Sequence, residues 1–337
     1  MNYSELVSRQ RQYFRGGEPT KIEHREKQLQ NLRRLITDNS DTLCDAVYQD
    51  LRKHPQTTYA AEIFVALVEI DYMLDNLKKW SKPTMVQKTF ATALDQPMIV
   101  RETLGVVLII SPWNYPIFLS LLPIIPAIAA GNTVVIKPSE MSPHTAEAFE
   151  KLFAKYFAPE FLTVGCPPIG KIVMAAAAKH LTPVTLELGG KCPVVVEDDA
   201  VIDITARRIA WGKWTNCGQT CIAPDYVLVS ESTKPKLVEA LRRCIGEFYG
   251  NDIKSSKDYS RIINKKHHDR ICSLLDSSHG TILFQGGEVD RDDLFIPPVI
   301  IDAKKDDPFM KDEIFGPVLP VLTIRDLDEA IDYINSG

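Results

Sequence analysis

Two short stretches of the chain place reactive side chains where they could do covalent chemistry. Cys221 ends the stretch Asn-Cys-Gly-Gln-Thr-Cys, just after a predicted helix and just before the strand-like run 225–229. Glu187 lies further upstream, at the end of an apolar run and before two glycines. A thiol and a carboxylate could be the nucleophile and the base of covalent catalysis. Taken alone, however, a cysteine is more often an inert core residue, so this pattern is only suggestive.

The surroundings of Glu187 favour a role as a base. The apolar run 184–187 is expected to form a strand, so the carboxylate at its end should be partly buried, with its pKa raised. A carboxylate that bonds a turn or caps a helix is the alternative. Cys217 lies four positions before Cys221, but no second Cys or His pair lies nearby and the histidines are scattered. We therefore expect no metal site.

Two loops that follow apolar strands carry polar side chains suited to a ligand. After the run 105–110, the loop Ser-Pro-Trp113-Asn114-Tyr-Pro offers an amide that could stabilise an oxyanion. A proline-bracketed loop with a packed tryptophan is the alternative. In Lys137-Pro-Ser-Glu140, the two charged residues could hold ribose hydroxyls, and a solvated turn is equally compatible. Both loops lie at carboxyl ends of strands, where open α/β sheets bind ligands.

A glycine-bounded turn precedes the next predicted helix. The chain has no G-x-G-x-x-G dinucleotide fingerprint, but Gly165-Cys-Pro-Pro-Ile-Gly170 opens the helix 169–180. Glycines allow backbone N–H groups to approach a phosphate, and a helix N-terminus favours an anion. A plain strand-to-helix turn explains the same residues, and on these residues alone it is the stronger interpretation.

Apolar runs that alternate with amphipathic segments indicate an α/β fold with a doubly wound parallel sheet and a second α/β series that begins near residue 200. Residues 21–80 are predicted to form two helices, and 82–101 could form an arm or hairpin. The predicted strands are 105–110, 133–137, 161–164, 184–187, 193–197, 225–230, 281–285, 295–301 and 317–324. The predicted helices are 117–130, 143–157, 169–180, about 200–215, 234–248, 265–278 and 326–335.

Composition excludes several classes of protein. The chain of 337 residues has 39 basic and 44 acidic side chains, a net charge of −5, which argues against a nucleic-acid surface. Seven cysteines, an odd number, indicate free thiols in a reducing compartment rather than a disulfide framework. The polar N-terminus has no signal-peptide core, and no apolar run is long enough to span a membrane. We therefore expect a cytoplasmic protein.

The motifs occur in a fixed order along the chain. P-W-N-Y-P is followed by K-P-S-E, G-x-x-x-x-G, L-T-P-V-T-L-E-L-G-G-K, N-x-G-Q-T-C and finally E-I-F-G-P at 313–317. This series resembles that of the aldehyde dehydrogenases and extends over nearly the whole chain. The run Ala-Lys-His-Leu-Thr-Pro-Val and the short N-terminus resemble class 3, whose members act on fatty or aromatic aldehydes.

The resemblance implies a role for each motif. Cys221 would be the nucleophile, Glu187 the base that activates the hydrolytic water, and Asn114, with the Cys221 N–H, the oxyanion donor. Lys137 and Glu140 would hold the adenosine ribose. The implied cofactor-binding residues are Trp113, Lys137, Glu140, Gly165, Gly170, Glu313 and Phe315. The cofactor would be NAD, with NADP as the alternative, because Glu140 should repel a 2′-phosphate.

The resemblance also implies a division of the chain. Residues 1–81 and 103–187 would form the NAD(P)-binding domain with its N-terminal helices, 82–102 an oligomerisation arm, and 188–337 a C-terminally incomplete catalytic domain. The expected partners are a small aldehyde and, from the family, a second copy of the chain in a homodimer. No nucleic acid is expected, nor any membrane segment in this chain; family members with a longer C-terminal tail can carry a membrane anchor.

The chain departs from the family pattern twice. Between Val164 and Gly165 the family has a further strand and helix, a unit of roughly 25–30 residues. The chain also ends at Gly337, before the family's C-terminal part. These differences indicate an alternative transcript or an incomplete gene model. The expected activity is oxidation of fatty or aromatic aldehydes to carboxylic acids through a thiohemiacetal and a thioester; the alternative is a catalytically impaired isoform that pairs with a full-length sibling.

Overall fold

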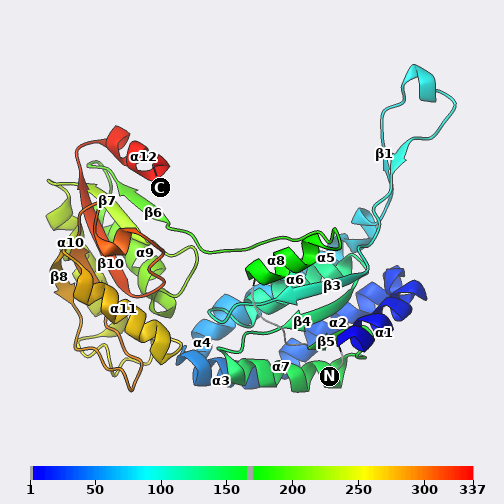
Figure 1. The fold of residues 1–337 in the computed structure, drawn as a ribbon, viewed down its shortest axis with the longest axis horizontal. Coiled ribbons are helices and arrows are strands. Elements are labelled where there is room, and N and C mark those ends of the chain that lie inside the picture. Colours follow the sequence, from blue (N-terminus) through cyan, green and yellow to red (C-terminus); the bar gives the residue numbers. More distant parts are fainter. Residues whose placement is uncertain (1–2, 165–169, 337) are drawn as a thin grey trace. The chain divides into compact units, whose positions relative to one another are not determined.

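The computed structural model describes residues 3–164 and 170–336, which fall into two compact units. The N-terminal unit comprises Met1–Asp50 and Pro55–Ala176, and the C-terminal unit comprises Leu51–His54 and Ala177–Gly337. Each unit is built around its own parallel or mostly parallel sheet with helices against it (Figure 1). The predicted α/β class is therefore confirmed.

The sheet of the N-terminal unit has three parallel strands in the order β3-β4-β5. Consecutive strands are joined by helical crossovers, as parallel pairing requires. Every residue of β4 is buried, which explains its continuous apolar sequence. The elements are β3 Val106–Ile110, α6 Phe118–Ala129, β4 Thr133–Lys137, α7 Pro143–Tyr156, β5 Leu162–Val164 and α8 Gly170–Ala178.

The helices before this sheet are more divided than the two that the sequence predicts for 21–80. They are α1 Tyr3–Arg15, α2 Ile22–Asp38, α3 Ser40–Leu51, α4 Pro55–Thr58, a π-helical turn Tyr59–Ile63 and α5 Phe64–Trp80. Helix α1 was not predicted, because it is polar and buries only Leu6 and Gln10. The Gln10 amide donates to the carbonyl oxygens of Val134 (3.0 Å) and Pro159 (3.3 Å), so a polar side chain fixes α1 to the sheet.

The π-helical turn orients one buried carboxylate. Glu62 has no exposed surface, and its Oε2 accepts hydrogen bonds from the backbone N–H groups of Ile117 (2.9 Å) and Phe118 (3.2 Å). These are amides of the first turn of α6, which have no partners within the helix. The carboxylate therefore caps α6 and holds the end of the loop that carries Trp113 and Asn114.

Residues 82–101 form a two-stranded antiparallel hairpin. Strand β1 (Thr84–Met85) pairs with β2 (Met98–Ile99), and a 3₁₀ turn, Phe90–Thr92, lies near its tip. The hairpin extends away from the rest of its unit (Figure 1, cyan). Phe90 and Leu94 are fully exposed there, as apolar side chains would be on a surface without a partner.

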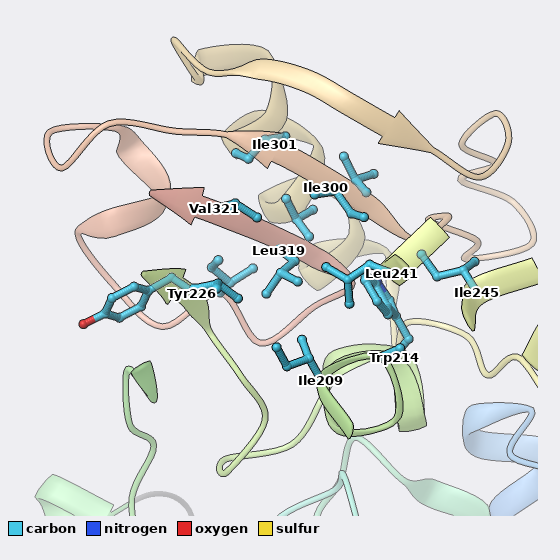
Figure 2. Close-up of a cluster of buried hydrophobic side chains, with 14 of the residues drawn as sticks. Ile209, Trp214, Tyr226, Leu241, Ile245, Ile300, Ile301, Leu319 and Val321 are labelled. Atoms are coloured by element: carbon cyan, nitrogen blue, oxygen red, sulfur yellow. The ribbon is translucent and has the colours of Figure 1, made fainter. Parts of the chain in front are cut away.

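The sheet of the C-terminal unit has five strands in the order β6-β7-β10-β9-β8, all parallel except β8, which pairs antiparallel with β9. Side chains of helices α9 and α10 meet those of β7, β9 and β10 in the main core (Figure 2). The elements are β6 Pro193–Val196, α9 Ile202–Trp214, β7 Tyr226–Ser230, α10 Lys234–Tyr249, α11 Lys265–Ser277, β8 Thr281–Gln285, β9 Val299–Asp302, β10 Val318–Ile324 and α12 Leu327–Asn335.

Two strand predictions are corrected by the structure. The run 184–187 is not a strand but part of an irregular segment, 182–192, in which Leu186 and Leu188 are exposed. A strand needs a neighbour to pair with, and among the described residues neither sheet offers one to this run. The strand predicted over 295–301 is shorter, β9, because Pro297 and Pro298 cannot donate ladder hydrogen bonds.

Candidate active site

Cys221 lies in a loop that reverses the chain between α9 and β7. Asn216 and Cys217 adopt left-handed backbone conformations (φ 53° and 57°), followed by Gly218 at φ 73°. A Cβ atom on Gly218 would lie 2.2 Å from the carbonyl oxygen of Gly316. Only glycine fits this position, because here the loop packs backbone against backbone onto the E-I-F-G-P motif.

Gln219 fixes the shape of the same loop from inside. It is fully buried, and its Nε2 donates to the carbonyl oxygens of Asn216 and Arg261, both at 3.0 Å. Its Oε1 accepts from the backbone N–H of Ile263 at 2.9 Å. The glutamine of N-x-G-Q-T-C therefore has a structural role: it links the loop that carries Cys221 to the distant segment 261–263.

The two cysteines of this motif differ in their surroundings. Cys217 is completely buried, and its thiol donates to the Tyr259 hydroxyl at 3.5 Å. Burial raises the pKa of Cys217 to about 12. Cys221 is only partly buried. Since the thiolate is the reactive form, Cys221 is the cysteine of the pair that could react with a ligand.

Lys191 joins three motifs through one ammonium group. Its Nζ donates to Asp225 Oδ2 (2.6 Å) and to the carbonyl oxygens of Phe309 (2.7 Å) and Asp312 (2.9 Å). The other oxygen of the buried Asp225 accepts the backbone N–H of Ile314 at 3.0 Å. The L-G-G-K segment, the strand that follows Cys221 and the start of E-I-F-G-P are therefore held together.

Glu313 lies against the two glycines that follow Glu187. Its carboxylate accepts the backbone N–H of Gly190, and a Cβ on Gly189 would lie 1.9 Å from its Oε2. Burial raises the pKa of Glu313, and the Gly190 hydrogen bond opposes part of that rise. Phe315, two residues on, is partly buried and holds a left-handed backbone conformation (φ 48°).

Two residues beside this cluster were missed in the sequence. Lys213 is buried at the end of α9, where desolvation lowers its pKa to about 8, although Asp225 and Glu313 favour its charge. The sequence feature that could have revealed it is a lysine between Ala210 and Trp214, on the apolar face of a helix. Cys192 is partly buried, and its Sγ lies 3.4 Å from the backbone oxygen of Cys221. A single thiol after a motif carries no sequence signal of that contact.

The expected environment of Glu187 is wrong. The side chain is exposed rather than partly buried, and within the described part of the chain no hydrogen-bond partner reaches its carboxylate. The reason is the missing strand: because 182–192 is irregular, no neighbouring strand covers the carboxylate. Glu187 is tethered four residues before the anchored Lys191.

In the N-terminal unit, the predicted residues lie at the carboxyl ends of β3 and β4. Trp113 and Asn114 are buried in the loop after β3. The backbone N–H of Ser111 donates to the oxygen of Lys137 at 2.9 Å, which ties the two strand ends together. The buried Lys137 forms an ion pair with Glu140, and this hydrogen bond holds the pKa of the Glu140 carboxyl below its ordinary value.

The Lys137–Glu140 pair fits the ribose of a dinucleotide. An ammonium donor and an exposed carboxylate acceptor lie side by side, as two adjacent hydroxyls would need, at the strand edge where such cofactors bind. Gly170 is the first residue of α8, whereas Gly165 lies outside the described residues. In the described residues, no group of three or more His, Cys, Asp or Glu side chains could hold a metal, and no helix is long and apolar enough to cross a membrane.

Solved structures share this architecture. A Staphylococcus aureus AldH in a substrate-bound state matches all of this chain and 78% of its own, with a TM-score of 0.96 and 39% identity. A gamma-glutamyl-gamma-aminobutyraldehyde dehydrogenase from Burkholderia cenocepacia matches 98% of this chain and 73% of its own, with a TM-score of 0.88 and 25% identity. The fold is thus that of an aldehyde dehydrogenase.

The chain belongs to the aldehyde dehydrogenase family, whose model matches residues 2–163 and 160–337. Mouse dimeric NADP-preferring aldehyde dehydrogenase is 43% identical over 99% of this chain and 78% of its own. Aldehyde dehydrogenase family 3 member A2 of Macaca fascicularis is 44% identical over 98% and 72%. The mouse alignment runs over 357 positions, more than the 337 residues here, so the relative has residues that this chain lacks. The two matched segments meet at 160–163, which places an interruption there.

Proposed function

We propose that this chain oxidises fatty or aromatic aldehydes to carboxylic acids, with Cys221 as the nucleophile. The observation that carries the proposal is the contrast within N-x-G-Q-T-C. Cys221 is accessible on a loop whose shape is set by buried hydrogen bonds, whereas Cys217 is sealed in the core. A rigid loop that presents one thiol is what a covalent mechanism requires.

The proposed reaction divides the chemistry among three residues. The Cys221 thiolate attacks the carbonyl carbon and forms a thiohemiacetal, while Asn114 and the Cys221 N–H donate hydrogen bonds to the oxyanion. Bound NAD or NADP supplies the hydride acceptor that makes the oxidation possible. Glu187 then takes a proton from the water that hydrolyses the resulting thioester on Cys221, which releases the acid and restores the thiol.

The proposed cofactor contacts follow from the two charged clusters. Lys137 and Glu140 hold the adenosine ribose, and Glu313 holds the nicotinamide ribose with Phe315 beside the ring. Trp113, Gly165 and Gly170 complete the cofactor-binding set. The Glu140 carboxylate favours NAD, because it would repel a 2′-phosphate; the mouse relative, by contrast, is named NADP-preferring. Both cofactors should therefore be assayed.

The proposed division of labour assigns one task to each part of the chain. Residues 1–81 and 103–187 would bind the cofactor and 188–337 would carry the nucleophile. The hairpin 82–102 would serve as a dimer arm, which its exposed Phe90 and Leu94 support, and the mouse relative is named dimeric. Free thiols at six described cysteines support a cytoplasmic location.

The test is formation of reduced nicotinamide with a panel of fatty and aromatic aldehydes. We expect Cys221→Ser to lower kcat/KM by about a thousandfold or more, because it removes the nucleophile. The matched control is Cys217→Ser, four residues away in the same loop, which should keep most of the activity. Turnover that survives in Cys221→Ser would exclude the proposed mechanism.

A second candidate is an impaired isoform that pairs with a full-length sibling. The exposed Glu187 on an unpaired segment favours it, as does the interruption at 160–163. Size-exclusion chromatography with and without the co-expressed sibling separates the two functions. A folded homodimer without turnover that exchanges into a mixed dimer would support this candidate, whereas an active homodimer would exclude it.

A further inference from the structure

A second thiol lies against the nucleophile loop. Cys192 is the last residue before β6, and its Sγ is 3.4 Å from the backbone oxygen of Cys221 and 3.7 Å from where a Cβ on Gly190 would lie. Its own carbonyl oxygen accepts the backbone N–H of Asp225 at 2.9 Å, which anchors the peptide while the side chain stays partly buried. The proposed mechanism gives this sulfur no task.

We propose that Cys192 is a resolving thiol that forms a reversible disulfide with Cys221 when the protein meets a peroxide. The Cys221 thiolate attacks one oxygen of hydrogen peroxide, the O–O bond breaks, and a sulfenic acid and water result. The Cys192 thiolate then attacks that sulfur and displaces hydroxide, which leaves as water once protonated. In sum, two thiols and one peroxide give one disulfide and two waters: sulfur is oxidised and peroxide oxygen is reduced.

The contact brings the Cys192 sulfur close to the backbone of Cys221. The carbonyl oxygen of a residue lies about 2.4 Å from its own Cα, because one C=O and one Cα–C bond separate them. The Cys192 sulfur is therefore within about 6 Å of the Cys221 Cα. A disulfide holds its two Cα atoms about 4.4–6.8 Å apart. Burial raises the pKa of the Cys192 thiol and Cys221 adds to that rise, so the two sulfurs also lie within electrostatic range of each other.

The other thiols of this unit are poorer partners for Cys221. Cys217 is sealed beneath Tyr259, and its left-handed backbone fixes it away from solvent. Cys244 is buried on the inner face of α10, where it belongs to the hydrophobic core. Cys272 is on α11, with its sulfur 3.6 Å from His268 Nδ1. Only Cys192 among the described thiols has a contact with the Cys221 peptide.

The segment that carries Cys192 also favours a reversible bond. Residues 182–192 form no strand, although the Cys192 carbonyl bonds to Asp225, and Pro193 begins a paired strand. The Cys192 side chain lies just before the paired strand, so its rotation breaks none of the backbone hydrogen bonds of β6. The disulfide would also stop Cys221 at the first stage of oxidation, before the irreversible sulfinic acid forms. This protective effect on activity rests on the proposed function; the bond itself does not.

The experiment is peptide mapping of the full chain after mild hydrogen peroxide, alkylation of free thiols and trypsin digestion. A Cys192–Cys221 disulfide joins the tryptic peptides 192–207 and 214–236. We expect this linked pair in the wild type and in Cys217→Ser, because peptide 214–236 contains both cysteines. It should be absent in Cys192→Ser and Cys221→Ser, and it should vanish on reduction with dithiothreitol.

Activity provides the second readout. Dithiothreitol should restore activity to the peroxide-treated wild type at least about tenfold better than to Cys192→Ser, in which Cys221 proceeds to sulfinic acid. Cys192→Ser should have normal turnover before peroxide. A linked pair through Cys217 or Cys166, or sulfinic Cys221 without any linked pair in the wild type, would overturn the inference. A disulfide in a chain without dehydrogenase activity would sink the proposed function and leave the disulfide standing.

Discussion

The candidate residues of the two units lie at opposite ends of their strands. In the N-terminal unit, Asn114 and Lys137 lie at or just past the carboxyl ends of β3 and β4. In the C-terminal unit, Cys192, Asp225 and the E-I-F-G-P motif precede the amino ends of β6, β7 and β10, which run parallel. The first set is held by a regular sheet, and the second by loops that lock onto one another.

In the N-terminal unit the candidate residues are positioned to bind a ligand, whereas in the C-terminal unit they also hold the loops in place. Glu140 is exposed, and its one described ion pair is local, so a substitution there should change ligand contacts and leave the sheet intact. Around Cys221, by contrast, glycine backbone, a buried amide and a buried ion pair each determine the loop. There a substitution should alter both stability and chemistry. The following four changes test that distinction.

Gly218→Ala should have the largest effect. Alanine there would hold an unfavourable left-handed backbone and place its Cβ 2.2 Å from the Gly316 oxygen. We expect a loss of about 4 kcal/mol in the local unfolding free energy and loss of turnover. Hydrogen exchange of the β7 and β10 amides measures it. The matched control is Gly246→Ala inside α10, where nothing lies within 4 Å of the new Cβ, so stability should rise by about 0.5–1 kcal/mol. Equal effects of the two substitutions would refute the close-approach argument.

Lys191→Met should have the next largest effect. It leaves the Asp225 carboxylate, only 4% exposed, without its cationic partner. A buried charge stripped of its partner costs about 3 kcal/mol, seen as a fall in the midpoint of urea unfolding. The double variant Lys191→Met/Asp225→Asn should recover part of that loss, since the buried carboxylate charge is removed together with its partner. If the double variant were no more stable than Lys191→Met, the ion pair would not be the cause.

Lys213 should give the C-terminal unit a distinctive pH dependence. Its pKa is about 8 when folded and near its ordinary 10.5 when unfolded, so between these values the unfolded state binds more protons and stability rises with pH. The gain is about 2–3 kcal/mol across that window. Cys217 and tyrosines titrate in the same pH range and change the stability in the opposite direction. The quantity to measure is therefore the wild-type unfolding free energy minus that of Lys213→Met, in which these other contributions cancel. A difference that stays flat with pH would contradict the lowered pKa.

Glu140→Gln should have the smallest effect on stability and a specific effect on the ligand. Removing the negative charge should shift the ratio of kcat/KM for NADP over NAD upward by about tenfold, because the 2′-phosphate is no longer repelled. The unfolding free energy should change by less than about 1 kcal/mol, because Glu140 is exposed and the glutamine amide oxygen can still accept a hydrogen bond from the buried Lys137 ammonium. Glu147→Gln, which removes the partner of Lys151 on α7, is the matched surface control and should leave the ratio unchanged.

The sequence predicted the regular elements well where periodicity and apolar runs were strong. Every residue of β4 is buried, as its continuous apolar sequence indicated, and α5 lies within the range 21–80 that was predicted to be helical. Helix α1 was not predicted because it is held to the sheet by the Gln10 amide, a contact that no hydrophobic pattern reveals. Residues 184–187 were misread because a strand depends on a neighbour, and a single run cannot show whether one exists.

The candidate site was predictable in its residue types but not in its contacts. The order of motifs identified Cys221, Glu187 and Lys137 as candidates, yet it placed Glu187 in a partly buried setting that the irregular segment does not provide. Cys192 and Lys213 were missed because their importance depends on long-range packing. One lies on the Cys221 peptide, and the other is desolvated at the end of α9.

The π-helical turn Tyr59–Ile63 sets the direction in which side chains point along the helical stretch from Pro55 to Trp80. A π turn carries one more residue than an α turn, and each residue of an α-helix turns the path by about 100°. Without the extra residue, the Glu62 side chain would be rotated about the helix axis by that angle relative to the buried side chains of α5. Only one of the two could then face α6. Deletion of a single residue here would thus remove either the Glu62 hydrogen bonds to the start of α6 or the packing of α5. No side-chain substitution could restore both.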